Sequence, residues 1–419
     1  MSFRAWLLLA LAPLLAATAP LPKAAPDQVG VSAERLGRVR ALVQRYIDRG
    51  EIAGAVSMVA RHGKVVHFEA QGVSDMETKS PLRTDAIFRL ASMTKPITSL
   101  AVMMLHEEGR FLLDDPISKF LPEFKDMKVA VANAPNEHAG AGSRLEPRRA
   151  PITVRHLLTH TSGIVYGTSG PVSDLAKQLR ALYKPEDVLA DYIKRLAALP
   201  LNFHPGDRWA YGLSVDVLGR LVEVVSGQSL DEFFRRRIFE PLGMRDTFFY
   251  LPDDRIVRLV SAYKPKGGGG ASLEKLTGLG PASRTGRLFT GGGGLAGTAE
   301  DYMRFCQMLI AGGQLDGTRL VSRKTIEAMT ANQIGPLTLS NSLDRNYGFG
   351  LGFRVRREVG QSSTLGSVGD YGWGGIYGTW FWVDPAEKLV GILMIQLYPN
   401  EHLNVRREFQ NAVTQAIVD

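Results

Sequence analysis

A serine and a lysine stand three residues apart in the string Ser92-Met93-Thr94-Lys95. If a helix begins here, that spacing places the hydroxyl and the amine on one face, within reach of each other. A serine beside a proton acceptor is an activated nucleophile, suited to attack on a carbonyl through a covalent intermediate. The alternative is structural, with Ser92 as a helix cap and Lys95 as a solvated side chain.

A second Ser-x-x-Lys string occurs at Ser272–Lys275, so the spacing alone is weak evidence. That string follows the glycine run at 267–270, which predicts a flexible loop and not the start of a helix. The surroundings of Ser92 differ and favour the catalytic interpretation.

The segments on either side of Ser92 predict elements that would hold it in place. Gly54–Ala60 and Lys64–Gln71 are apolar-rich runs separated by a short polar turn, which predicts a strand hairpin. After Ser92, apolar residues recur at helical spacing until Gly109, a helix stop signal. We therefore expect Ser92 at the N-terminal end of a buried helix, where the helix dipole and free N–H groups favour negative charge.

The string Phe88–Pro96, which contains both residues, is followed by further recognisable strings in a fixed order. These are Gly109–Pro122, Ile152–Gly163, Pro205–Gly206 with Trp209–Tyr211, Glu240–Thr247 and Gly291–Phe305. The series resembles the serine β-lactamase and penicillin-binding superfamily, and in particular its class C branch. The resemblance extends from about residue 28 to the end of the chain.

Two blocks of that family are altered here. The Tyr-x-Asn block corresponds to Tyr211-Gly212-Leu213, without the asparagine; a literal match at Tyr398–Asn400 lies out of order and is taken as chance. The Lys-Thr-Gly block corresponds to Trp373-Gly374-Gly375, followed by a predicted strand over Ile376–Val383.

The replaced lysine helps to hold a substrate carboxylate in β-lactamases and peptidases, so its loss argues against such substrates. Tyr-x-Leu with Trp-Gly-Gly resembles the family VIII carboxylesterases and related acyltransferases instead. The resemblance implies substrate binding by Leu213 and by the altered third block, Trp373, Gly374 and Gly375.

Catalytic roles follow from the matched serine, lysine and tyrosine. A free tyrosine has a pKa near 10, and a lysine cation about 4 Å from a phenol, at an effective dielectric of about 20, supplies about 4 kcal/mol toward the phenolate. We expect Lys95 to be that charge and Tyr211 to be the general base that later protonates the leaving alcohol. The opposite assignment, with a neutral Lys95 as the base, stays open because the two groups would titrate as a coupled pair.

The transition state also needs donors for a developing oxyanion. We expect these to be the backbone N–H groups of Ser92 and Ile376, with Gly374 and Gly375 allowing the substrate to approach the strand closely. Loss of one such donor typically costs about 2.7 to 4 kcal/mol. The structural alternative makes Trp373 a core aromatic and the glycines a bulge.

Composition limits the other classes of function. The chain has 419 residues with a formal charge of +8, but the basic residues are dispersed and no nucleic-acid motif occurs. The densest cluster, Arg235–Arg237, predicts the solvated face of an amphipathic helix. His156 and His160 stand four apart without an acidic partner, so no metal is expected, and no cofactor is predicted. The expected partner is a small-molecule ester.

The first 19 residues have the pattern of a signal peptide. Arg4 precedes an apolar stretch that ends at Ala17-Thr18-Ala19, with an uncertain cleavage site. No other apolar run is long enough to cross a membrane. These features predict a periplasmic or secreted protein, and the lone Cys306 excludes an internal disulfide.

The resemblance implies an α+β or α/β architecture of the serine β-lactamase-like, or penicillin-binding-protein-like, fold. An antiparallel sheet flanked by helices would form a discontinuous α/β domain from 27–115 and 291–419. A mostly helical domain at 116–290 would be inserted and carry Tyr211. A helix at Ser32–Arg49, a strand at Lys388–Gln396 and a closing helix at Asn404–Ile417 belong to the first domain.

The leading prediction is a serine carboxylesterase that cleaves short to medium acyl esters through a Ser92 acyl-enzyme, with weak cephalosporin hydrolysis on the shared scaffold. The alternatives are an acyltransferase with the same mechanism, a class C β-lactamase or D-Ala-D-Ala peptidase, and a non-catalytic penicillin-binding-like sensor. The natural acyl and alcohol groups and the oligomeric state are not specified by the sequence.

Overall fold

The structure is a computed structural model that describes residues 19–131, 144–166, 184, 186–266, 272–278, 286–339, 346–360 and 362–419. The predicted signal peptide at 1–19 lies outside the described residues except for Ala19. Among the described helices, none combines the length and apolar character needed to cross a membrane.

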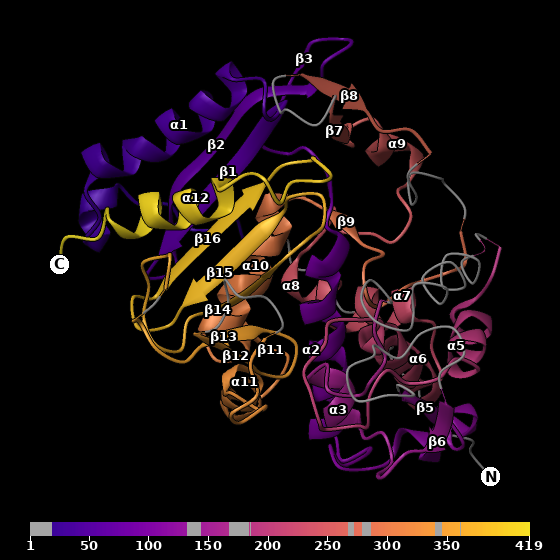
Figure 1. Cartoon of the computed structure of the whole chain (residues 1–419). Helices are drawn as coiled ribbons and strands as arrows, with labels where there is room; N and C mark the ends of the chain where they lie inside the picture. Colours follow the sequence, from indigo (N-terminus) through magenta and orange to yellow (C-terminus); the bar gives the residue numbers. More distant parts are fainter. Residues whose placement is uncertain are drawn as a thin grey trace, which may run out of the picture.

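One antiparallel sheet dominates the part of the chain that the structure describes (Figure 1). Its eight strands, in spatial order, are β12 (Tyr347–Phe349), β13 (Arg354–Arg356), β14 (Tyr371–Gly374), β15 (Trp380–Asp384), β16 (Leu389–Met394), β1 (Gly54–Arg61), β2 (Lys64–Asp75) and β3 (Ser80–Pro81). N-terminal and C-terminal segments therefore build one sheet, with β1 paired to β16 at its centre. This arrangement confirms the predicted fold class.

The remaining strands of the described chain form short pairs. They are β4 (Phe88–Arg89) with β9 (Ala296–Gly297), β5 (Lys128–Val131) with β6 (Arg144–Pro147), β7 (Tyr263–Pro265) with β8 (Leu273–Lys275), and β10 (Gln314–Leu315) with β11 (Thr318–Arg319).

The described helices and helical turns lie before, between and after these strands in the chain. The α-helices are α1 (Ala33–Asp48), α2 (Thr94–Glu107), α3 (Val154–Leu158), α5 (Leu189–Ala197), α6 (Ser214–Ser226), α7 (Leu230–Phe234), α8 (Glu240–Leu242), α9 (Asp253–Ile256), α10 (Ala299–Ile310), α11 (Arg323–Thr330) and α12 (Val405–Thr414). The described 3₁₀-helical turns are η1 (Pro26–Val29), η2 (Ala91–Met93), η3 (Ile117–Lys119) and η4 (Pro122–Phe124), and η5 (Arg235–Phe239) is π-helical.

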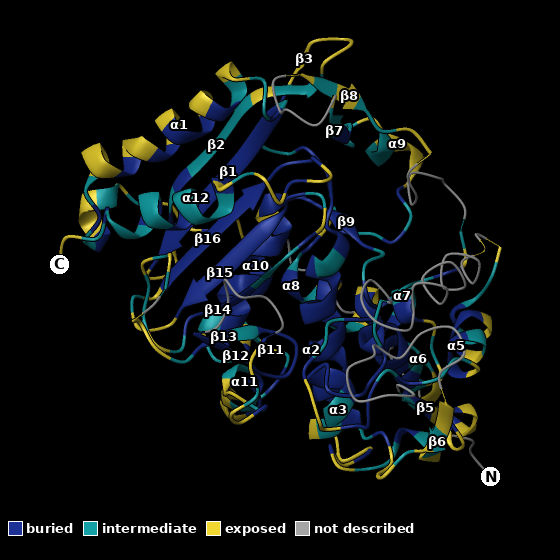
Figure 2. Cartoon of the chain, viewed as in Figure 1, coloured by how far each residue is buried: buried dark blue, intermediate teal, exposed yellow. Residues whose placement is uncertain are grey.

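Helices cover both faces of the sheet, which explains why β1 is buried along its whole length. Alternate residues of a strand point to opposite faces. Val56 and Met58 join the core beneath α10, whereas Ala55 and Val59 join the core beneath α1 and α12. Figure 2 shows the buried strands between these helices and the exposed outer surface of α1. A two-sided burial of this kind requires the continuous apolar run seen in the sequence.

The predicted elements nearest the site are present with small shifts. The hairpin is β1–β2, the helix after Ser92 is α2, and the two terminal helices are α1 and α12. Ser32 caps α1, because its side chain accepts a hydrogen bond from the Arg35 backbone N–H at 3.3 Å.

One local prediction is wrong. The segment after β14 is not a strand from Ile376, because Gly375–Thr379 forms a turn and β15 begins only at Trp380. Gly378 takes φ +97°, which side-chain-bearing residues rarely adopt. The Ser272–Lys275 string does not begin a helix, as predicted, whereas the glycine run at 267–270 lies outside the described residues. The string supplies β8, and the Lys275 ammonium donates to Asp75 and so ties the β7–β8 pair to β2.

The predicted domain limits stay a prediction. The range 116–290 holds α3, α5–α9 and two strand pairs, β5–β6 and β7–β8. Of these, the β7–β8 pair lies against the sheet, since the Tyr263 N–H donates to the Gln396 carbonyl at 3.0 Å. The three arginines Arg235–Arg237 are half-buried to exposed and pair with glutamates, so they form no open basic patch.

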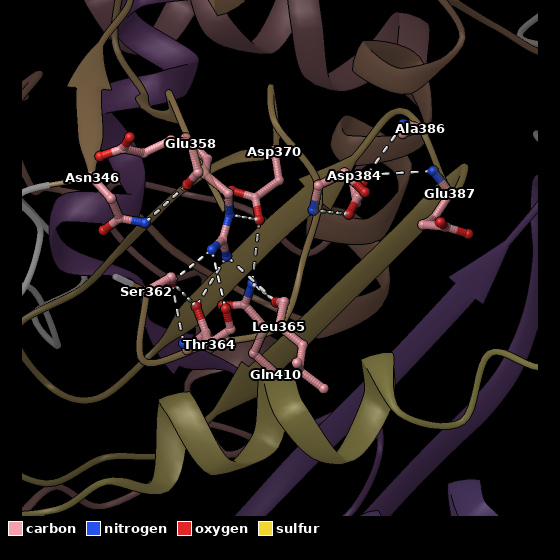
Figure 3. A network of polar contacts seen from close by, with 12 residues as sticks. Asn346, Glu358, Ser362, Thr364, Leu365, Asp370, Asp384, Ala386, Glu387 and Gln410 are labelled. Atoms are coloured by element: carbon pink, nitrogen blue, oxygen red, sulfur yellow. Dashed lines mark hydrogen bonds and ion pairs between the residues drawn. The ribbon is translucent and has the colours of Figure 1, made fainter. Parts of the chain in front are cut away.

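A buried ion pair fixes the start of β14. Arg356 and Asp370 are almost fully buried, and Arg356 Nε donates to Asp370 Oδ2 at 2.7 Å. The rest of the Arg356 guanidinium is satisfied by oxygens of the loop between β13 and β14, including Ser362 Oγ at 2.6 Å. Figure 3 shows Ser362, Thr364 and Leu365 of this loop close to Asp370 and to Gln410, whose Nε2 donates to Asp370 Oδ2 at 3.5 Å. A buried charge must be fully paired in this way, so the network holds the loop and the strand together.

A second buried carboxyl lies in the first turn of α10. Asp301 accepts hydrogen bonds from Thr247 Oγ1 at 2.7 Å and from the Asp246 N–H at 2.8 Å. Burial raises the pKa of Asp301 to about 7, although these hydrogen bonds act in the opposite direction. In the unfolded chain an aspartate titrates near 4. Between about pH 4 and 7 the folded protein therefore keeps a proton that the unfolded chain has lost.

That difference predicts that the free energy of unfolding falls as pH rises from about 4 to 7, by at most about 1.4 kcal/mol per pH unit for this group. Asp301→Asn keeps an acceptor but cannot titrate, so its stability should depend less on pH over this window. Urea unfolding at pH 4.5 and pH 7 measures the difference, with Glu300→Gln as the exposed neighbouring control. An unchanged pH dependence in Asp301→Asn would refute the assignment.

Candidate active site

Ser92 lies in the helical turn η2, immediately before α2. The preceding Ala91 has φ +46°, an unfavourable conformation for a residue with a side chain. Two contacts hold the turn: the Leu90 N–H donates to the Leu295 carbonyl at 2.9 Å, and the Tyr302 hydroxyl donates to the Met93 carbonyl at 2.9 Å. The half-buried Ser92 side chain is thus presented from a strained and firmly held turn.

Lys95 is buried, with 1% of its surface exposed, and its ammonium has three hydrogen-bond acceptors. They are Ser92 Oγ at 3.1 Å, the Tyr166 hydroxyl at 3.0 Å and the Gly292 carbonyl at 2.6 Å. A protonated lysine has three N–H donors and no acceptor, so this set matches the charged form. Lys95 and Ser92 are therefore brought together as the sequence predicts.

The electrostatic surroundings also favour the charged form of Lys95. Burial acts to lower the pKa of Lys95, but the Tyr166 and Tyr211 phenols and the Asp216 carboxyl raise it, and the net direction is upward. Asp216 is itself buried, which raises its pKa, while Lys95 lowers it. This arrangement supports Lys95 as a fixed cation in preference to Lys95 as the base.

Glycine is required where the chain passes between α2 and α6. The Gly292 N–H donates to Asp216 Oδ1 at 3.0 Å while its carbonyl accepts from Lys95. A Cβ at Gly292 would lie 2.4 Å from Asp216 Oδ2, and one at Gly291 would lie 2.7 Å from the Val215 carbonyl. The chain at Gly291 and Gly292 therefore makes a close approach of backbone to two helices.

Tyr211 lies beside Lys95, but its ring and not its hydroxyl faces the ammonium. Lys95 Nζ is 4.7 Å from the centroid of the Tyr211 ring. The Tyr211 hydroxyl accepts a hydrogen bond from Trp373 Nε1 at 3.1 Å. Trp373 therefore contributes a donor to the site, and this donor is directed at the predicted base.

Tyr166 is the site residue that sequence reasoning missed. Its hydroxyl is bonded to Lys95, and its ring lies 5.3 Å from that of Tyr211, centroid to centroid. Burial is the main cause that raises the pKa of Tyr166, against the lowering effect of Lys95. Tyr166 follows the matched string Ile152–Gly163 by three residues, and only that proximity could have drawn attention to it.

The predicted oxyanion donor lies on the turn after β14. A Cβ at Gly375 would lie 2.3 Å from the Leu90 carbonyl and 2.2 Å from Thr379 Oγ1, so the turn packs directly against the segment that leads to Ser92. Within the described part of the chain, the N–H of Ile376 has no acceptor. Its side chain is 49% exposed. A free donor beside the nucleophile is what an oxyanion site requires.

Leu213 is set apart from the other predicted binding residues. It is buried in the main core and precedes α6. Leu213 stands where the Tyr-x-Asn pattern has asparagine, so this position offers an apolar side chain to the core and no polar group to the site. Trp373 and Gly374 are half-buried, and Trp373 packs against Phe349 and Tyr211.

Neither histidine of the four-residue pair is placed to hold a metal. His156 Nδ1 accepts from the Thr153 N–H at 3.2 Å and so caps α3. His160 lies beyond α3, with its ring 4.9 Å from that of Tyr211, and burial keeps the pKa of His160 well below its ordinary value. Among the described residues, no cluster of three or more histidine, cysteine, aspartate or glutamate side chains could bind a metal.

Comparisons with known proteins show the family to which the chain belongs. Residues 39–415 match the family model described as Beta-lactamase. Esterase EstB of Burkholderia gladioli is 32% identical over 380 residues, covering 87% of this chain and 91% of EstB. The lovastatin esterase of Penicillium rubens is 33% identical over 375 residues, covering 84% of this chain and 91% of that enzyme.

Among solved structures, the chain is similar to "EstCE1, a hydrolase with promiscuous acyltransferase activity". The two share 28% identity with a TM-score of 0.74, over 91% of this chain and 98% of EstCE1.

Removing the Tyr211 hydroxyl should lower the reactivity of Ser92 more than removing the Tyr166 hydroxyl. Tyr211→Phe removes the predicted base and should slow covalent labelling of Ser92 by a fluorophosphonate by about 10²-fold or more. Tyr166→Phe removes one acceptor of Lys95 but leaves the charge, so we expect a loss of about tenfold. The second-order labelling rate is the measurement, with Tyr46→Phe in α1 as the control. A large loss in Tyr166→Phe with near-normal labelling of Tyr211→Phe would reverse the assignment of the base.

Proposed function

The chain belongs to the β-lactamase family, and we propose that it is a serine carboxylesterase of the family VIII type that cleaves short to medium acyl esters. The observation that carries the proposal is the Lys95 ammonium bonded to Ser92 Oγ beside two tyrosines, with Trp373 bonded to Tyr211. The first part supplies an activated nucleophile. The second part supports an uncharged substrate.

In the proposed acylation step, Ser92 Oγ attacks the ester carbonyl carbon while its proton passes to the Tyr211 oxygen, which reacts as the phenolate that the Lys95 cation stabilises. The carbonyl π electrons move to the oxygen, which becomes an oxyanion held by the N–H groups of Ser92 and Ile376. The C–O bond to the alcohol then breaks, and Tyr211 returns the proton to the leaving oxygen. Water repeats the sequence on the acyl-enzyme and releases the acid.

Lys95 has a constant role in this scheme. Its charge lies against the Tyr211 ring and donates to Ser92 Oγ, so it stabilises negative charge on either group. It keeps its proton throughout, because the Tyr166 and Gly292 oxygens and the nearby Asp216 favour the ammonium form. The catalytic proton therefore moves between Ser92, Tyr211 and the leaving group.

The composition of the wall beside Ser92 supports an ester substrate. The resemblance places Trp373 where β-lactamases have the lysine that holds a carboxylate. Trp373 packs against Phe349 with a centroid distance of 5.3 Å, and its N–H is directed at Tyr211. An apolar wall of this kind suits an uncharged acyl or alcohol group. Weak cephalosporin hydrolysis stays a prediction.

Acyl transfer to an alcohol is the second candidate. It needs the same acyl-enzyme and differs only in the nucleophile that resolves it. The similar structure EstCE1 is that of a hydrolase with promiscuous acyltransferase activity, and this likeness favours the second candidate. Product ratios in the presence of added alcohol would separate transfer from hydrolysis.

The esterase proposal predicts that the parent protein hydrolyses p-nitrophenyl butyrate and that Ser92→Ala lowers kcat on the order of 10⁴-fold or more. The matched control is Ser272→Ala, which removes the serine of the other Ser-x-x-Lys string and should be active. Steady-state release of p-nitrophenolate measures all three proteins.

Equal rates in the parent and Ser92→Ala would disprove the assignment of the nucleophile. No turnover in the parent would contradict an esterase for this ester class and favour the sensor or peptidase alternatives.

A further inference from the structure

The turn between β14 and β15 is held by side chains from outside it. Arg406, in the first turn of α12, donates from Nη2 to the Gly375 carbonyl and from Nε to the Gly378 carbonyl at 3.4 Å. Asn400 Nδ2 donates to the Ile376 carbonyl at 2.6 Å and to the Leu397 carbonyl at 2.7 Å. Three carbonyls of the turn, those of Gly375, Ile376 and Gly378, are thus held by α12 and the segment before it.

The contact with Gly375 has a chemical consequence for Ile376. The Gly375 carbonyl and the Ile376 N–H belong to the same peptide group. A cation that accepts part of the carbonyl's electron density increases the positive charge on the N–H, and hydrogen bonds in such a chain strengthen one another. The Ile376 N–H is the predicted oxyanion donor and has no acceptor among the described residues.

We propose that Arg406 is a positioning residue for the reaction, which orients and polarises the Gly375–Ile376 peptide so that the Ile376 N–H stabilises the oxyanion. This inference rests on the proposed ester hydrolysis. Arg406 does not touch the substrate, since its guanidinium is used on the carbonyl side of the peptide. Its effect is therefore on the transition state and not on substrate binding.

The position of Arg406 supports a role for its charge. Its side chain is half-buried, with the guanidinium carbon 5.8 Å from the Trp380 ring centroid. Burial and the nearby Arg354 lower the pKa of Arg406 to about 10, against the effect of Glu401, so Arg406 is charged at neutral pH. A cation in a partly dehydrated place acts more strongly on a neighbouring peptide than one in water.

The turn at Gly375–Thr379 has two bonds of its own, and Arg406 adds bonds from outside the turn. Gly375 and Gly378 carry no side chains, and Gly378 takes φ +97°. Within the turn, the Gly378 N–H donates to the Gly375 carbonyl at 3.0 Å and the Gly375 N–H donates to the Thr379 carbonyl at 2.8 Å. The Gly378 N–H and Arg406 thus share the Gly375 carbonyl and both orient the Gly375–Ile376 peptide, but only Arg406 brings a full charge to it. Asn400 holds the next peptide through the Ile376 carbonyl.

The test compares Arg406→Gln and Arg406→Lys with the parent and with Arg407→Gln, the next arginine of α12. The reaction is p-nitrophenyl butyrate hydrolysis. The second readout is the inhibition constant of an alkyl trifluoromethyl ketone, which forms an oxyanion when Ser92 adds to it. Folding is checked by thermal unfolding. Arg406→Gln should lower kcat by about tenfold, less than the 10²–10³ loss typical of a deleted donor, with KM within about twofold.

The inhibition constant of the ketone should rise by the same factor, because substrate hydrolysis and inhibition share the oxyanion. Arg406→Lys keeps a charge but, as a single ammonium, cannot hold both carbonyls, so it should fall between the parent and Arg406→Gln. If Arg406→Gln does not fold, Arg406→Lys provides the comparison.

A folded Arg406 variant with the kcat and inhibition constant of Arg407→Gln would overturn the inference and leave the esterase proposal intact. A loss of kcat with unchanged ketone inhibition would also overturn it, because the defect would not involve the oxyanion. A parent protein without Ser92-dependent hydrolysis would remove the proposed function and this inference together.

Discussion

The buried ammonium of Lys95 is the constraint on which the rest of the site depends. An isolated charge inside a protein is costly, and it is tolerated only when its donors are satisfied. Lys95 meets that condition with oxygens from three separate segments, Ser92, Tyr166 and Gly292, and with Asp216 nearby. The glycines at 291–292, the start of α6 and the segment after α3 must therefore converge on α2. The same contacts that stabilise the cation also place it against the nucleophile.

The second half of the site comes from the sheet. β14 carries Trp373 and ends at the turn that presents Ile376, while the buried Arg356–Asp370 pair fixes where β14 begins. α12 covers the sheet face opposite α10, and from there Arg406 reaches the turn. The proposed nucleophile and the proposed oxyanion donor thus belong to different parts of the fold, joined where the Gly375 backbone packs against Leu90.

The Ser92–Lys95 pair and the elements around it could be predicted from the sequence, because the signals for them lie close together in the chain. Ser92 and Lys95 share one turn, and the hairpin, α2 and the terminal helices follow from apolar periodicity and stop signals. Tyr166 could not be predicted from its own pattern, because its role arises from a contact with Lys95 across 71 positions of the chain. The sequence pattern over Ile376–Val383 predicts a strand, because the pattern of β15 extends back into the turn. The backbone bends there instead, since Gly378 has φ +97° and Gly375 packs directly against Leu90. The contacts of Arg406 could not be predicted from the sequence, because its partners are backbone carbonyls, which every residue has.

The most direct test of the account is the identity of the covalent intermediate. The protein is mixed with p-nitrophenyl butyrate, quenched in acid within milliseconds, and analysed by intact mass and peptide mapping. The account predicts a butyryl adduct on the peptide that contains Ser92, formed before steady-state turnover and absent from Ser92→Ala. Hydrolysis without an adduct at Ser92, or with the adduct on another residue, would contradict it.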